Sequence, residues 1–240
     1  MSETVDILAI GVHPDDVELS ASGTLMKQIE QGSSVAIVDL TRGELGSRGS
    51  AALRIEEAGR AADIMGISHR VNLGMEDGFF EANTENKRRI IEQIRRFRPK
   101  VVLANAIHDR HPDHGRAAKL TSDACFLAGL RKIETSWDGK PQEHHRPEAV
   151  YHYIQDYYLE PDFVVDVTDY VDRKIEVIKA FSSQFYDPLS KEPATPISGE
   201  DFFDFIKSRM RNFGRPAGVP FAEGFTRSRY LRVDDLFDLK

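Results

Sequence analysis

The chain has 240 residues, 40% of them hydrophobic and 30% charged, with a formal net charge of −7. This length suits a single α/β domain over residues 1–240, although two small domains would also fit. The negative charge argues against a general affinity for nucleic acid or anionic membranes. The one cysteine, Cys125, excludes an internal disulfide and a cysteine-rich zinc site, and we interpret it as a core residue.

No apolar run approaches the roughly 20 residues that are needed to span a bilayer. No basic region precedes the first apolar stretch, which argues against a signal peptide. We therefore expect a soluble, cytoplasmic protein that has no nucleic-acid or membrane partner.

Strand-like and helix-like segments alternate through the first 130 residues. Short apolar runs predict strands at 5–10, 35–40, 69–73 and 101–104. Helical spacing predicts helices at 19–31, 51–65, 86–98 and from about residue 116, the second with Ile55, Ala58, Ala62 and Met65 on its buried face. This alternation predicts an α/β fold, a Rossmann-like, doubly wound, mostly parallel sheet flanked by helices.

The second half of the chain contains two long connections. Residues 131–148 are expected to form a polar loop, in which His144 and His145 are solvated rather than metal ligands. Residues 187–200 contain three prolines and are interpreted as a lid or an oligomer contact. The remaining segments predict strands at 150–154 and 163–167, helices at 170–186 and 202–212, and a Gly- and aromatic-containing tail at 214–225.

The motif His13-Pro14-Asp15-Asp16 follows the first predicted strand directly. Pro14 fixes its own φ and restricts His13 to extended geometry, which stiffens the turn. His13 and Asp16 can then converge on one ion while Asp15 points elsewhere. Alternatively, the adjacent carboxylates only complement the dipole of the following helix.

A second cluster at residues 108–115, which contains the motif His111-Pro112-Asp113-His114 and also His108, Asp109 and Arg110, follows the fourth predicted strand. In a doubly wound sheet, strands one and four flank the switch point where ligands bind. His13, Asp16 and His114 would then form a metal site with positions open to water, as in catalytic zinc enzymes. The same ligand set also suits Fe²⁺. The alternative is two unrelated polar loops.

The two motifs resemble those of the LmbE/PIG-L family of zinc-dependent N-acetylglucosamine deacetylases. Segments 39–46, 151–155, 183–186 and 222–225 resemble the bacillithiol-biosynthesis branch, so the resemblance covers essentially the whole chain. It implies a homo-oligomeric deacetylase with one zinc per chain, acting on N-acetylglucosaminyl malate. The alternatives are another N-acetylglucosaminide, of the chito-oligosaccharide or mycothiol type, or a catalytically silent sugar-binding protein.

The remaining residues of the motifs have expected chemical roles. Asp15 is not needed as a ligand and can act as the general base, a role that the resemblance also implies. His111 fits an imidazolium that stabilises the oxyanion, and Asp113 is expected to orient His111 or another imidazole. No G-x-G-x-x-G turn, P-loop or G-x-S-x-G motif supports a dinucleotide, NTPase or serine-hydrolase function.

A malate conjugate brings two carboxylates, which a chain of net charge −7 would repel without local positive charge. Arginines at the strand ends are suited to bind them because the guanidinium fork matches a carboxylate. The alternative is that Arg42 and Arg54 pair with Glu44 and Glu57 to hold the loop. The expected substrate-binding residues are Arg42, Glu44, Arg54 and Arg110.

Overall fold

The structure is a computed structural model that describes residues 3–238, so the single domain expected over 1–240 extends beyond these residues at both ends. The first half contains β1 (Ile7–Gly11), α1 (Asp16–Glu30), β2 (Val35–Thr41), α2 (Ala51–Met65), β3 (His69–Met75), α3 (Thr84–Phe97), β4 (Val101–Ala104) and α4 (Pro112–Ala128). The second half contains β5 (Ser136–Trp137), β6 (Lys140–Pro141), β7 (Ala149–Tyr153), β8 (Phe163–Asp166), α5 (Val171–Lys179), α6 (Phe202–Gly214) and β9 (Ala222–Arg227).

Seven of these strands form one sheet in the order β3-β2-β1-β4-β7-β9-β8. The pairs from β3 through β7 are parallel, whereas β9 runs antiparallel to both β7 and β8. The mostly parallel, doubly wound α/β fold is therefore confirmed. The strand β9 was not predicted, because the sequence Ala-Glu-Gly-Phe-Thr-Arg carries a buried glutamate and a glycine that weaken the strand signal.

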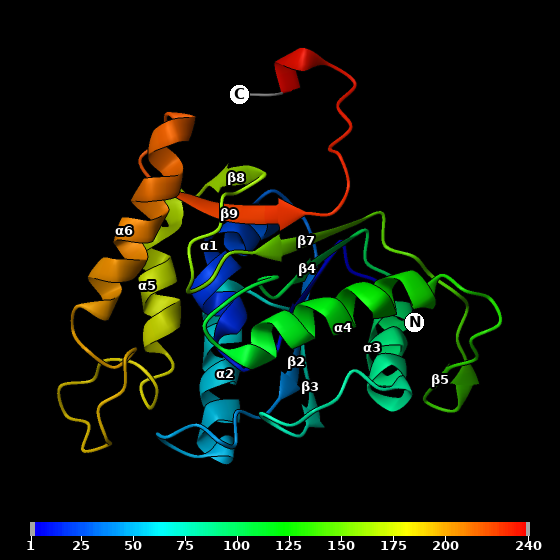
Figure 1. Cartoon of the computed structure of the whole chain (residues 1–240), viewed down its shortest axis with the longest axis horizontal. Helices are drawn as coiled ribbons and strands as arrows, with labels where there is room; N and C mark the ends of the chain where they lie inside the picture. The colour runs from blue at the N-terminus through cyan, green and yellow to red at the C-terminus, as the bar shows by residue number, and fades with distance from the viewer. Residues whose placement is uncertain (1–2, 239–240) are drawn as a thin grey trace.

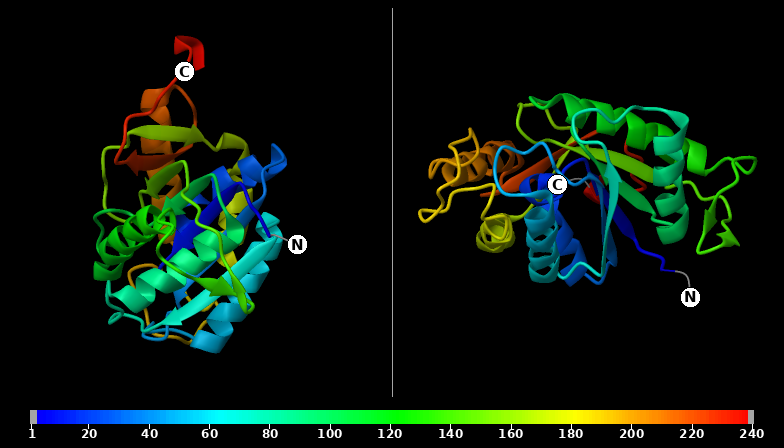
Figure 2. Two further views of the ribbon diagram at one scale, coloured as in Figure 1. Left: turned by 90° about the vertical axis from the view of Figure 1, so that its right-hand side faces the viewer. Right: turned by 90° about the horizontal axis from the view of Figure 1, so that it is seen from below.

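Helices cover both faces of the sheet, and each face has its own hydrophobic core (Figures 1 and 2). Leu25 of α1 and Ile178 of α5 belong to one core, and Ile91 of α3 and Leu120 of α4 belong to the other. Successive residues of β1 alternate between the two cores, as expected for a strand buried on both faces. Figure 1 shows α6 beside α5 at one edge of the molecule.

Two helices begin three or more residues earlier than the sequence predicted. The helix α1 begins at Asp16 rather than at residue 19, and α4 begins at Pro112 rather than at about 116. Proline is favoured in the first turn of a helix, and the His111 side chain accepts a hydrogen bond from the Asp113 N–H. Each motif therefore runs from the turn after its strand into the first turn of the following helix.

The predicted helix 170–186 was too long, since α5 ends at Lys179. Its apolar stripe is nevertheless buried, including Phe181 and Phe185 beyond the helix end. Glu57 accepts hydrogen bonds from the backbone N–H and hydroxyl of Ser183, which competes with continuation of the helix.

The expected buried face of α2 was partly wrong, because Ile55 is 45% exposed. Arg54 and Glu57 are buried there instead, each with a polar partner. Cys125 lies in the core, as predicted, and burial raises the pKa of its thiol to about 12.

The expected polar loop at 131–148 contains the short hairpin β5–β6. His145 in this segment hydrogen-bonds through Nε2 to the Pro99 carbonyl at 2.7 Å. Within residues 3–238, each helix is too short or too polar to traverse a bilayer.

Candidate metal and substrate site

The two motifs meet at the carboxyl edge of the sheet. The strands β1 and β4 are hydrogen-bonded neighbours, and each delivers one motif to the start of a helix. A cavity of about 320 Å³ opens here, lined by His13, Asp15, Asp16, His111 and His114 and, on its far side, by α6. The predicted meeting of the two motifs at the switch point between β1 and β4 is confirmed.

Asp16 is the most tightly held residue of the site. Its Oδ2 accepts hydrogen bonds from the backbone N–H of Val12 and of His13 and from Nδ2 of Asn105, at 2.9–3.0 Å. Its Oδ1 accepts one from Nε2 of Gln155 at 2.7 Å. Burial favours the neutral acid, but the neighbouring imidazoles hold the Asp16 pKa well below its usual value. Asp16 therefore presents a fixed, ionised carboxylate.

Two imidazoles face Asp16, each with its second ring nitrogen bound to another carboxylate. His114 Nε2 lies 3.2 Å from Asp16 Oδ1, and its Nδ1 contacts Asp109 Oδ2 at 2.5 Å. His13 Nδ1 lies 3.8 Å from Asp16 Oδ2, and its Nε2 contacts Asp77 Oδ1 at 3.0 Å. Metal-binding histidines in proteins are commonly oriented by an outer carboxylate in this way.

The protonation of these imidazoles reflects the surrounding carboxylates. Burial lowers the pKa of both rings, but this effect is outweighed. The carboxylates of Asp113, Asp16 and Asp77, which accept from the protonated ring, raise the His13 pKa well above its usual value. The charge of Asp16 and the hydrogen bond to Asp109 raise the pKa of His114 to about 9. A divalent cation would have to displace these protons.

The donor groups fit zinc, and they also fit Fe²⁺. Ligand atoms of His13, His111 and His114 lie within 4.8 Å of one another, as do those of His13, Asp77 and Asp113. The region thus offers more donors than one ion needs. Asp77 contacts the ring nitrogen of His13 that lies away from Asp16, which suits an outer partner better than a ligand.

Asp15 combines an unusual backbone conformation with an ion pair. Its φ is 137°, in the region that non-glycine residues rarely adopt, and such strain is concentrated at functional sites. Its Oδ2 accepts a hydrogen bond from Nη2 of Arg54 at 2.5 Å. Burial raises the pKa of Asp15, and the charge of Arg54 opposes this effect only in part. The carboxylate is therefore held in place while its affinity for a proton is increased.

His111 lies beside both other histidines, with ring centroids 4.7 Å from His13 and 5.3 Å from His114. Its Nδ1 accepts a hydrogen bond from the Asp113 N–H at 3.3 Å, so its proton is on Nε2. Burial and the two neighbouring imidazoles lower the His111 pKa. This environment favours a neutral donor rather than the imidazolium expected from the sequence.

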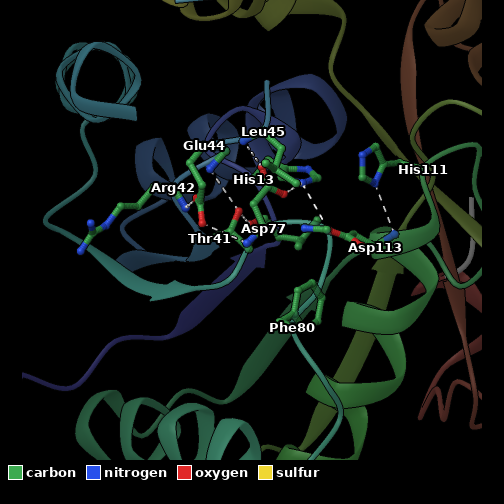
Figure 3. A network of polar contacts seen from close by, with 12 residues as sticks. His13, Thr41, Arg42, Glu44, Leu45, Asp77, Phe80, His111 and Asp113 are labelled. Atoms are coloured by element: carbon green, nitrogen blue, oxygen red, sulfur yellow. Dashed lines mark hydrogen bonds and ion pairs between the residues drawn. The ribbon is translucent and has the colours of Figure 1, made fainter. Parts of the chain in front are cut away.

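Asp113 is directed toward His13, as Figure 3 shows. Its Oδ2 lies 3.7 Å from His13 Nε2 and accepts a hydrogen bond from the Gly78 N–H at 2.9 Å. Its carboxylate contacts His13 rather than His111, which was one of the two alternatives considered.

Four residues that hold this side of the site had no role predicted from the sequence, namely Asp77, Asn105, Asp109 and Gln155. Asp109 lies only two residues before His111, and its nearness to a metal motif was a usable signal. Asp77 reaches His13 from 64 residues away, and Gln155 reaches Asp16 from 139 residues away. Those two pairings depend on the fold and have no local signature.

The four expected substrate residues separate into two groups. Arg54 and Arg110 line the cavity. Arg42 is exposed and is directed away from His13 in Figure 3. Glu44 accepts hydrogen bonds from the backbone N–H groups of Arg42 and Asp77, so it holds the loop.

The alternative interpretation paired Arg54 with Glu57, and the structure contradicts this pairing. Arg54 pairs with Asp15, while Glu57 binds Ser183. The sequence analysis did not identify further cavity-lining polar residues, which are Arg48, Gln184 and Arg209.

Comparisons with known proteins agree with this geometry. The family profile PIG-L, described as GlcNAc-PI de-N-acetylase, matches residues 8–125. Diacetylchitobiose deacetylase from Thermococcus kodakarensis is 28% identical over 228 residues, which cover 91% of this chain and 81% of that protein. The probable N-acetyl-alpha-D-glucosaminyl L-malate deacetylase 2 from Bacillus anthracis is 26% identical over 192 residues, covering 75% and 81%. The crystal structure of the conserved protein TT1542 from Thermus thermophilus superposes with a TM-score of 0.84 at 34% identity, covering 96% and 98%.

Proposed function

Because this chain belongs to the PIG-L family of deacetylases, we propose that it removes the acetyl group from an N-acetylglucosaminide, using one zinc ion per chain. The observation that carries this proposal is the convergence of His13 and His114 on the fixed carboxylate of Asp16, at the floor of a cavity. We assign His13, Asp16 and His114 as the metal ligands. A zinc ion supplies a Lewis acid for the amide carbonyl and a nucleophilic water at neutral pH.

The side chains around the ligands would carry the proton transfers. Asp15 is held by Arg54 and has an increased proton affinity, so it suits a general base that takes a proton from water and returns it to the leaving amine. His111 would donate its Nε2 proton in a hydrogen bond to the oxyanion. Asp77, Asp109 and Asp113 would orient His13 and His114.

We propose N-acetylglucosaminyl malate as the first substrate to test, with Arg54 and Arg110 as contacts to the aglycone. Both line the cavity, and guanidinium groups bind carboxylates more strongly than neutral hydroxyls. Arg42 and Glu44 would reach only an aglycone that extends beyond the cavity. N,N'-diacetylchitobiose and a mycothiol-type glucosaminyl inositol are the competing substrates.

A substrate panel tests the proposed function. Zinc-loaded protein is mixed with the malate conjugate, diacetylchitobiose, the N-acetylglucosaminyl inositol and methyl N-acetylglucosaminide, and free amine is measured. We expect release from at least one substrate and none after chelation. A protein that binds zinc but releases no amine from any of the four would favour the alternative of a catalytically silent sugar-binding protein. Reconstitution with Fe²⁺ identifies the better metal, and light scattering tests the proposed homo-oligomer.

A further inference from the structure

The cavity extends toward α6 from the side formed by His13, Asp16 and His114, here called the metal side. A second hollow of about 240 Å³ adjoins it, and Arg110, Asp156, Phe202 and Phe205 line both spaces. In an N-acetylglucosaminide the aglycone is attached to C1, next to the carbon that bears the acetamide. If the acetamide lies beside the histidines, the aglycone is no more than one sugar ring away from them. It can then contact the lining formed by Arg110, Asp156, Phe202, Phe205 and Arg209, here called the far wall.

Arg209 projects from α6 into this wall, with a side chain that is only 15% exposed. Its Nη2 donates to the Asp156 carbonyl at 2.5 Å and lies 3.7 Å from Asp156 Oδ1. The Phe205 ring packs 4.5 Å from its Cζ. Among residues 3–238, its hydrogen bonds all come from Nη2, so Nε and Nη1 are available to a ligand.

The charges of the far wall do not balance. Arg110 and Arg209 both contact the carboxylate of Asp156, and Asp201 is a second carboxylate in the lining of the adjoining hollow. Asp15 is already paired with Arg54, and Asp16 and Asp77 contact the histidines. Arg48 also lines the cavity and donates to the Ser190 hydroxyl rather than to a carboxylate, so three guanidinium groups stand against two carboxylates and leave one excess positive charge.

We propose that Arg209 is a specificity-determining residue, which with Arg110 binds an aglycone that carries a carboxylate. This inference rests on the proposed deacetylase function and names the part of the chain that selects among its substrates. Asp156 preorganises the two guanidinium groups, and the excess charge is left for the substrate carboxylate. A neutral aglycone would leave this charge uncompensated in a half-buried wall.

The test compares Arg209→Gln with Arg211→Gln, a matched control on the same helix. Arg211 is exposed and lies outside both hollows, against Phe221. We expect Arg209→Gln to lower kcat/KM for N-acetylglucosaminyl malate by about 10- to 100-fold, as for a lost hydrogen bond to a charged group. Turnover of methyl N-acetylglucosaminide should change less than about twofold, and Arg211→Gln should change neither.

The salt dependence of substrate preference is a second measurement, and a purely structural role of Arg209 would not affect it. In the parent protein, added NaCl should reduce the preference for the malate conjugate over the methyl glycoside. This salt dependence should be weaker in Arg209→Gln. Equal losses on both substrates, or no loss on the malate conjugate, would overturn the inference.

Failure of the proposed function can be recognised separately. If the parent protein releases amine from no substrate, calorimetry with free L-malate measures anion binding at the far wall without catalysis. Weaker malate binding by Arg209→Gln than by Arg211→Gln would then support the anion site. Malate that binds both variants equally, or binds neither, would overturn it.

Discussion

The two walls of the cavity are built differently. On the metal side, Asp16 accepts four hydrogen bonds, and His13 and His114 each contact an outer carboxylate. On the far wall, two arginines share one carboxylate. The metal side lies at the ends of two central strands, whereas the far wall comes from α6 and the connections around it. We thus assign the chemistry to side chains that are held by several hydrogen bonds each. We assign substrate selection to side chains that are held by fewer.

The largest effect should come from removing a ligand on the metal side. His114→Ala should lose most of its zinc and its deacetylase activity, because the substitution removes the Nε2 donor that faces Asp16. Metal content by mass spectrometry and the far-ultraviolet circular dichroism spectrum check loss of zinc without loss of fold. His145→Ala, in the 131–148 segment, is the control. One tightly bound zinc in His114→Ala would contradict the ligand assignment.

Asp15→Asn separates the base from the ligands. The side chain is nearly isosteric, so the variant should retain zinc while its rate falls by about 10²–10⁴, as for loss of a general base. Single-turnover amine release measures this loss, with the exposed Asp172→Asn as the control. A near-normal rate, or loss of the zinc, would mean that Asp15 has another role.

Zinc affinity should depend steeply on pH. The pKa of His114 is raised to about 9, and that of His13 is raised well above its usual value, so both rings gain protons in the metal-free protein as pH decreases. Zinc must displace these protons, so affinity should fall as pH decreases, by up to about 100-fold per pH unit for two protons. Chelator competition at pH 6, 7 and 8 measures the slope. If the zinc affinity did not change between pH 6 and pH 8, both rings would already be unprotonated in the metal-free protein.

A smaller effect should follow from changing an outer partner. Asp109→Asn keeps the size of the side chain but removes the charge that contacts His114 Nδ1. Outer-shell changes typically cost about 10–100-fold in metal affinity, so zinc should bind more weakly yet remain measurable. Titration against the exposed Asp169→Asn checks this. An unchanged zinc affinity would show that zinc binding by His114 does not depend on the charge of Asp109.

The difference between the walls also explains what could be predicted from the sequence. The metal side follows from short motifs beside apolar runs, so the fold class and the meeting of the two junctions were predicted correctly. Arg209 was not predicted, because it lies 53 residues beyond Asp156 on a helix that looks like an ordinary amphipathic one. Arg42 was expected near the substrate because it follows a strand, but strand-end position does not determine side-chain direction.

Asp109 joins the two walls. Its Oδ2 contacts His114, and its Oδ1 accepts from the backbone N–H groups of Arg110, Asp156 and Tyr157. The proposed metal ligand His114 and the loop that contacts both arginines proposed to bind an anion thus share one rigid carboxylate. If zinc changes the position of this carboxylate and thereby the affinity for an anionic ligand, reciprocity requires that the ligand change zinc affinity by the same factor. Occupancy of one end of the cavity would then be thermodynamically coupled to occupancy of the other.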